Sequence, residues 1–241
     1  MKAVFYPASE RGHANFGWLD SYHSFSFGNW YDPAKVHFGA LRVLNDDHVT
    51  GGAGFGLHPH DNMEIVSIPF AGSLTHKDST GTDGIIRTGD VQIMSAGSGI
   101  RHSEYNASKT DPVNFLQIWI IPKVRNIQPR YDQKSFDLAA RAGQWQVVVS
   151  PDETEGGVWI NQDSRFALTR LDVGQEISFT PKFKGNGVYL FVLEGSAEVK
   201  DARTPALGRR DAIGISGADQ FTVQAGSEST ELLVIEVPML S

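Results

Sequence analysis

The chain has 241 residues, of which 40% are hydrophobic and 20% are charged, and its formal net charge is −7. This is ordinary globular composition, and the negative charge excludes a broad basic surface for nucleic acid or anionic lipid. No apolar run reaches the roughly 18 residues that a membrane span needs, the N-terminus lacks the apolar region of a signal peptide, and cysteine is absent. We therefore expect a cytoplasmic protein with no direct nucleic-acid or membrane partner, no disulfides and no thiolate metal site.

Short apolar segments alternate along the chain with clusters of Gly, Asp, Asn and Pro. These segments are rich in β-branched and aromatic residues, which is typical of strands bounded by turns. The expected strands lie at residues 63–70, 91–94, 114–121, 144–150, 187–195 and 231–237. The best helix candidate is short and lies around Ser135–Arg141. The pattern predicts an all-β sandwich or barrel.

The two halves of the chain resemble each other. The stretch "IPFAGSLTHKDS" (68–79) aligns with "FVLEGSAEVKDA" (191–202), since both have an apolar run, then Gly-Ser, then Lys-Asp. Such self-similarity is the signature of a duplicated unit. We predict two similar β-domains, covering residues 1–130 and 131–241.

Every histidine of the chain lies at or before His102, so imidazole chemistry is confined to the first half. Residues two apart on a strand point to the same face, which applies to His58 and His60 and again to His102 and Glu104. Two strands that each offer two ligands can converge on one ion. Neutral imidazole and carboxylate suit divalent Zn, Fe, Ni, Cu, Mn or Co. The spacing therefore predicts a metal site in the first domain.

The second half has no equivalent of these ligands. Alignment of the repeats places apolar residues opposite all of them: His58 with Pro181, His60 with Phe183, His102 with Val223 and Glu104 with Ala225. None of these four side chains can bind a divalent ion. We predict that the C-terminal domain is free of metal.

Other polar residues of the first half leave alternatives open. On a regular strand Glu64 would face the same side as His58, so Glu64 is a rival ligand or a hydrogen-bond partner of a ligating imidazole. His13 and His23 have aromatic neighbours and are expected to pack among them. His76 is expected to be structural or to line a pocket.

The motif around the paired histidines resembles the first motif of the cupin superfamily, G-x5-H-x-H-x3,4-E-x6-G, with the last glycine one residue late. The segments "FGLHPHDNMEI" (55–65), "IMSAGSGIRHSEYN" (93–106) and "QIWIIP" (117–122) are similar to the pirin family within this superfamily. The resemblance is dense over residues 10–150 and thins in the second half. It extends to bacterial pirin-like proteins that act as quercetin 2,3-dioxygenases.

The resemblance implies a bicupin, in which two cupin-type β-barrels pack face to face with a few short helices. It implies one divalent metal in the N-terminal barrel, held by His58, His60, His102 and Glu104, with Glu64 outside the ligand set. Fe(II) is the first expectation for the metal, with Zn, Ni, Cu, Mn and Co as alternatives.

The function that the resemblance implies is a metal-dependent dioxygenase. It would cleave a flavonol such as quercetin with O2 and release carbon monoxide. Glu104 would be catalytic, accepting the proton of the enolic hydroxyl of the substrate. A flavonol needs a largely apolar pocket. The candidates for its walls are Phe55, Met63, Met94, Phe115 and Trp119.

Two other functions use the same ligands. The first is a metal-binding regulatory protein of the pirin type, which contacts a protein partner and has no turnover. The second is a cupin isomerase or hydrolase that acts on another small molecule. Consumption of O2 and flavonol against a control without enzyme separates the dioxygenase from both.

Overall fold

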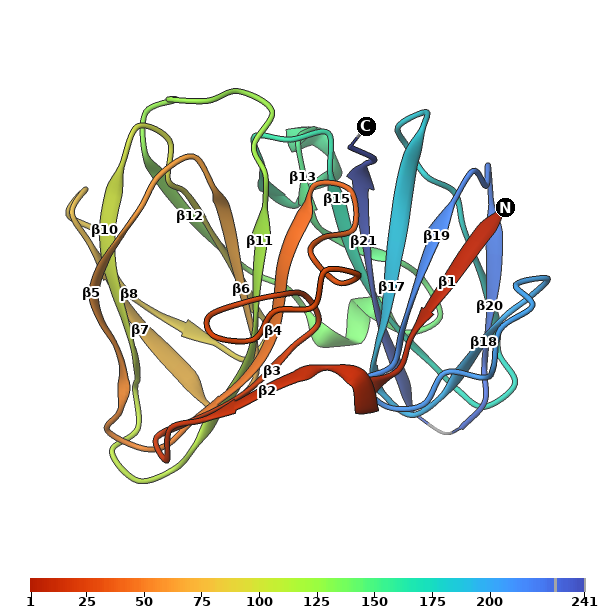
Figure 1. The fold of residues 1–241 in the computed structure, drawn as a ribbon, viewed down its shortest axis with the longest axis horizontal. Helices are drawn as coiled ribbons and strands as arrows, with labels where there is room; N and C mark the ends of the chain where they lie inside the picture. The colour runs from red at the N-terminus through yellow and green to blue at the C-terminus, as the bar shows by residue number, and fades with distance from the viewer. Residues whose placement is uncertain (228, 241) are drawn as a thin grey trace.

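The chain forms two β-barrels that lie side by side, as the computed structural model shows for residues 1–227 and 229–240 (Figure 1). In this part of the chain, each barrel combines one seven-stranded sheet with a smaller sheet of four or three strands. The helices among these residues are single 3-10 turns at Ala8–Glu10, Leu138–Arg141 and Glu153–Glu155. The prediction of an all-β chain with few short helices is confirmed.

The first barrel pairs its strands in an antiparallel manner. Its larger sheet has the order β12 (Arg130–Ser135), β9 (Asp90–Ser95), β6 (Glu64–Ala71), β11 (Val113–Ile120), β4 (Leu41–Val49), β3 (Leu19–His23) and β2 (Gly12–Asn15). Its smaller sheet has the order β5 (Gly54–His60), β10 (Ile100–Asn106), β7 (Ser73–Asp78) and β8 (Asp83–Arg87).

The second barrel repeats this arrangement. Its larger sheet has the order β1 (Lys2–Tyr6), β19 (Ala212–Ser216), β17 (Asn186–Glu194), β21 (Thr230–Pro238), β15 (Arg165–Leu171), β13 (Gln146–Ser150) and β14 (Val158–Trp159). Its smaller sheet has the order β16 (Glu176–Phe179), β20 (Phe221–Ala225) and β18 (Ala197–Val199). Each expected strand is present, within a residue or two of its predicted ends.

The predicted repeat is visible at a turn that recurs in both barrels. Gly72 joins β6 to β7 and Gly195 joins β17 to β18, each leading from the larger sheet into the smaller one. Their φ angles are 76° and 79°, in the left-handed region that glycine adopts without steric cost. The Gly-Ser pair in the two aligned segments therefore marks the same turn.

The two larger sheets pack against each other in the middle of the molecule. One apolar cluster contains Val66 and Leu116 of the first barrel together with Phe166 and Tyr189 of the second. β17 and β21, inner strands of the second sheet, are buried on both faces along most of their length, which explains their nearly continuous apolar sequences. The prediction of a face-to-face bicupin is confirmed.

Each larger sheet includes one strand that the chain order would place in the other barrel. β1 pairs with β19 of the second barrel, from Lys2 opposite Ser216 to Tyr6 opposite Ala212. β12 begins at Arg130 and pairs with β9 of the first barrel. The expected helix near residues 135–141 was placed too early, because Ser135 still belongs to β12 and the 3-10 turn begins at Leu138.

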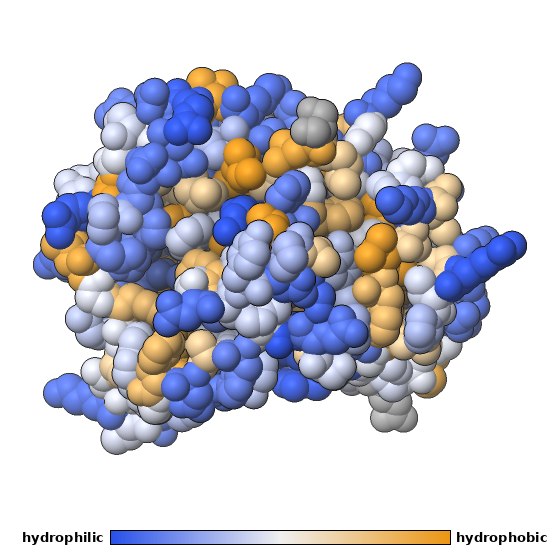
Figure 2. Space-filling model, in the orientation of Figure 1, coloured by the Kyte–Doolittle hydropathy of each residue, from blue (hydrophilic) through white to orange (hydrophobic). Residues whose placement is uncertain are grey.

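Hydrophilic and hydrophobic side chains are interspersed on the face of the molecule in Figure 2. Large exposed apolar residues include Phe16, Tyr31 and Leu57. Within residues 1–227 and 229–240, no helix has the length and apolarity that a membrane span requires.

Candidate metal centre

The predicted ligands lie on β5 and β10, which are antiparallel neighbours in the smaller sheet of the first barrel. His58 is directly opposite His102, and strand alternation places His60 on the same face. The ring centroids are 4.5 Å apart for His58 and His102, 4.8 Å for His58 and His60, and 4.9 Å for His60 and His102. Two residue pairs with i and i+2 spacing therefore bring three imidazoles together, as the sequence predicted.

Glu104 is buried two residues beyond His102, next to a register shift between β10 and β5. Its Oε1 accepts a hydrogen bond from Ser67 Oγ at 3.2 Å, and its Oε2 accepts one from Gln117 Nε2 at 3.4 Å. Both donors belong to the larger sheet, on β6 and β11, so the carboxylate points across the barrel interior. Burial raises the pKa of Glu104, although nearby imidazoles and these hydrogen bonds oppose the shift.

Two triads of potential ligands share His102. The first is His58, His60 and His102, and the second is His76, His102 and Glu104. In each triad one ligand atom from every residue lies within 4.8 Å of the others. His102 therefore links the paired histidines of β5 to Glu104, and His76 is grouped with Glu104.

His76 was expected to be structural or to line a pocket, whereas the structure places it among the potential metal ligands. It lies on β7 directly opposite Glu104, is fully buried, and its Nε2 lies 3.0 Å from Asp78 Oδ2. Its ring is 4.6 Å from that of Tyr131 on β12. The spacing of His76 and Asp78 is again i and i+2, which is the sequence signal that could have found this residue.

The hydrogen bonding of the buried ring nitrogens indicates whether these residues can bind a metal ion. Both nitrogens of His102 are buried and have no hydrogen-bond partner among the described residues. Buried polar atoms of this kind are costly unless something binds them. His58 Nδ1 lies 2.7 Å from the carbonyl of Gly56; donation to this carbonyl leaves Nε2 free for a metal. The donor set therefore fits a divalent transition metal.

The protonation of the imidazoles agrees with this fit. Burial, together with the neighbouring imidazoles of His58, His60 and His76, lowers the pKa of His102 to about 2. Burial also lowers the pKa of His60 to about 4. Both rings are neutral near pH 7, which is the form that binds metals.

Glu64 lies apart from the cluster because the chain turns between the two strands. β5 ends at His60, Asn62 has a left-handed φ of 46°, and Glu64 begins β6 in the other sheet. Its Oε2 accepts hydrogen bonds from Ser95 Oγ at 2.8 Å and from the Asn161 amide at 3.1 Å. No ligand cluster in residues 1–227 and 229–240 includes it. The regular strand assumed over residues 58–64 was wrong, and Glu64 instead joins the two barrels.

A cavity of about 910 Å³ opens onto the imidazoles of His58 and His60. Its other walls come from β4, β11 and the N-terminal stretch of residues 13–30. Aromatic rings in these walls contact one another, with centroids 5.3 Å apart for Trp18 and Phe55 and 5.4 Å for Phe27 and Trp119. The cavity therefore has aromatic walls, as pockets for small apolar molecules commonly do.

Only some of the predicted wall residues line this cavity. Phe55 and Trp119 do so, whereas Met63, Met94 and Phe115 belong to apolar clusters behind it. His13 stacks on Tyr22 and His23 meets Phe27 edge-on, which confirms their aromatic packing. Both histidines also line the cavity, as do Trp18, Trp30, Asn45, Asp47 and Gln117, which sequence reasoning did not single out.

Two β-barrels packed face to face define a bicupin. The imidazoles and the carboxylate in the first barrel are typical of a cupin metal site. The family model described as "Pirin" matches residues 5–120, and the model described as "Quercetinase C-terminal cupin domain" matches residues 147–237. The chain belongs to the pirin family.

The similarity to named proteins extends over almost the whole chain. It is 42% identical to quercetin 2,3-dioxygenase of Escherichia coli K12 over 234 residues, which is 96% of each protein. It is 37% identical to a pirin-like protein of Caulobacter vibrioides, covering 95% of this chain and 97% of that protein. The crystal structure of the E. coli pirin YhhW in complex with nickel(II) superimposes with a TM-score of 0.91 at 37% identity, covering 99% of this chain and 100% of the other.

Proposed function

We propose that this protein is a metal-dependent dioxygenase that cleaves a flavonol such as quercetin with O2 and releases carbon monoxide. The observation that carries the proposal is the pair of potential ligand triads that share His102, one with His58 and His60 and one with His76 and Glu104. His58 and His60 also line the aromatic cavity. The name of the E. coli relative supports the choice of substrate.

His58, His60, His102 and Glu104 would hold the ion, with His76 as a further donor beside them. When bound, a divalent metal supplies Lewis-acid and template chemistry to a substrate oxygen. Fe(II) remains the first candidate, and nickel is included because a pirin of E. coli was crystallised with it. The four side chains are positioned by neighbouring strands of one sheet, which keeps the donors close without rearrangement.

The protein side chains perform three tasks in this reaction. The aromatic walls around Trp18, Phe27 and Trp119 exclude water and orient the flat substrate. The Glu104 carboxylate, whose pKa is raised by burial, accepts the proton of the enolic hydroxyl. Ser67 and Gln117 hold that carboxylate in place through their hydrogen bonds.

The overall reaction balances without another reductant. A flavonol and one O2 give a ring-opened ester and one carbon monoxide, so one carbon and one oxygen leave as gas. Two oxygen atoms are added to the flavonol skeleton, whose central ring opens.

Aerobic turnover of quercetin by the metal-loaded protein tests the proposal. Protein loaded separately with Fe(II), Ni(II), Mn(II), Co(II), Cu(II) or Zn(II) should consume quercetin and O2 in equal amounts and release carbon monoxide. The double variant His58→Ala, His60→Ala should lose at least about a hundredfold in rate, since loss of a partner of a ligand alone costs 10–100-fold. His37→Ala is the matched control, because His37 is exposed and lies outside the cluster.

Two results would contradict the proposal. Unchanged turnover in the double variant would separate the reaction from this centre. Tight metal binding without consumption of quercetin or O2 would favour the regulatory protein of the pirin type.

A further inference from the structure

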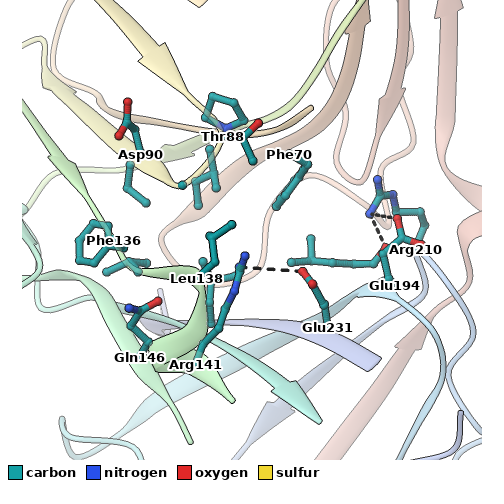
Figure 3. A pocket seen from close by; sticks show the side chains of 17 residues that line it. Phe70, Thr88, Asp90, Phe136, Leu138, Arg141, Gln146, Glu194, Arg210 and Glu231 are labelled. Carbon is teal, nitrogen blue, oxygen red and sulfur yellow. Dashed lines mark hydrogen bonds and ion pairs between the residues drawn. The ribbon is translucent and has the colours of Figure 1, made fainter. Parts of the chain in front are cut away.

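A second cavity lies between the two barrels. It has a volume of about 260 Å³ and is lined by residues of both barrels and of the segment that joins them (Figure 3). Phe70, Phe136, Leu138 and Leu168 provide apolar walls. This cavity shares no lining residue with the one above the imidazoles, so it is a separate space.

Arg141 is the unusual group in this cavity. Its side chain is only 9% exposed, and its guanidinium makes no hydrogen bond to any described residue. The nearest acidic atom is Glu231 Oε2, 3.9 Å from Arg141 Nη1 and beyond hydrogen-bond distance (Figure 3). A guanidinium without a hydrogen-bonded partner keeps its N–H donors available to a ligand. The cavity therefore presents a long Arg141–Glu231 ion pair, whose side chains make no hydrogen bonds to the described residues.

The other charged groups of the cavity are already paired. Asp90 accepts hydrogen bonds from Ser135, Gln133 and the Arg87 amide. Arg210 lies 2.8 Å from Asp46, and Glu194 lies 2.7 Å from Arg209. These groups already have hydrogen-bonded partners, whereas Arg141 and Glu231 have only their long contact with each other.

We propose that the cavity between the barrels is a second small-molecule site, which takes an α-amino acid with an apolar side chain. Such a ligand carries a carboxylate for Arg141 and an ammonium for Glu231 on a single carbon. A simple carboxylate would leave Glu231 facing an anion, and a simple amine would leave Arg141 facing a cation. The apolar side chain of the amino acid would pack against Phe70, Phe136 and Leu138.

Titration calorimetry with probes that separate the two charges tests the ligand class. L-phenylalanine and L-leucine should bind with dissociation constants below about 1 mM, while 3-phenylpropionate and 2-phenylethylamine should bind at least about tenfold more weakly. Equal binding of either half-ligand, or no binding of the two amino acids at about 10 mM, would overturn the proposal.

Variants locate the binding to this cavity. Arg141→Gln and Glu231→Gln should each weaken L-phenylalanine binding at least about tenfold. Arg125→Gln is the matched control, because Arg125 is exposed and does not line the cavity. Because Arg141 is buried, its variant is checked by thermal unfolding, and Glu231→Gln decides the test if that variant does not fold.

The metal centre provides the last control. His58→Ala should bind L-phenylalanine as the wild type does, because the two cavities are separate. Loss of binding in His58→Ala, or unchanged binding in both cavity variants, would refute a site between the barrels. The result does not depend on turnover of quercetin, so failure here leaves the proposed function untouched, and the reverse also holds.

Discussion

The smaller sheets of the two barrels share their architecture and differ in chemistry. The middle strand of each alternates buried and more exposed positions. The buried residues are Ile100, His102, Glu104 and Asn106 on β10, and Phe221, Val223 and Ala225 on β20. The same backbone pattern thus presents a polar cluster to one interior and an apolar core to the other. A duplicated barrel can keep one copy as a scaffold while the other holds a site.

The two barrels also differ in how well their buried polar atoms are satisfied. Unpartnered buried atoms in the first barrel include those of His76, His102 and Trp119. The smaller sheet of the second barrel is closed by the apolar cluster around Phe179 and Val223. Unpaired buried polar groups reduce stability, whereas apolar burial increases it. We therefore expect the second barrel to contribute stability and the first to contribute chemistry.

The largest effect on stability is expected from Phe179→Ala. Phe179 is 1% exposed and packs against Trp145 and Phe221. Its truncation should lower the free energy of unfolding by about 3–5 kcal/mol in urea titrations followed by circular dichroism. The affinity for Ni(II) should stay unchanged, because the candidate metal ligands lie in the other barrel. The exposed Val173→Ala serves as a control, and a loss of Ni(II) affinity in Phe179→Ala would show that the barrels are not independent.

His102→Val gives the first barrel the residue that the second one carries at Val223. It should weaken Ni(II) or Zn(II) binding by more than about a hundredfold in calorimetry, since His102 belongs to both triads. The metal-free protein should be no less stable than the wild type, because the variant removes a buried imidazole without partners. His37→Ala should leave the affinity unchanged. Wild-type metal affinity in His102→Val would contradict the conclusion that this position separates the chemistry of the two barrels.

The smallest effect is expected from Asp47→Asn in the first barrel. Burial raises the pKa of Asp47 to about 7, although a hydrogen bond from Ser21 opposes the shift. The folded state therefore binds more protons than the unfolded state between about pH 4 and 7. Stability falls as the pH rises across this range and levels off above the folded-state pKa. Between pH 6 and 8 the wild type should lose about 1.4 kcal/mol relative to Asp47→Asn.

Urea titrations at several pH values measure this difference. The exposed aspartate Asp172 offers the control, since Asp172→Asn makes the same charge change in the second barrel. A parallel pH dependence of Asp47→Asn and the wild type would show that Asp47 is not the titrating group.

Much of the candidate site could be predicted from residue spacing. Pairs such as His58 with His60, and His102 with Glu104, point to one side because a strand alternates its side chains every residue. The glycines at positions 72 and 195 marked the duplicated turn for a similar local reason. Absence of histidine after His102 was enough to assign the imidazoles to the first barrel.

Other parts of the site depend on contacts between distant segments. His76 joins the cluster because β7 pairs with β10, and Glu64 leaves it because the chain turns at Asn62. The aromatic wall of residues 13–30 comes from β2, β3 and the segments next to them, at the edge of the larger sheet. Residue spacing carries no information on which strands become neighbours.

The sequence by itself therefore determined the strands, the duplication and the chemical character of each half, because alternation and turn preference are local properties of the backbone. Only the tertiary structure decided that β1 joins the second barrel, that β12 joins the first, and that His76 lies beside Glu104. It also decided that a cavity with Arg141 and Glu231 lies between the barrels. These features follow from strand pairing and packing over long separations, where burial of apolar surface selects the partner.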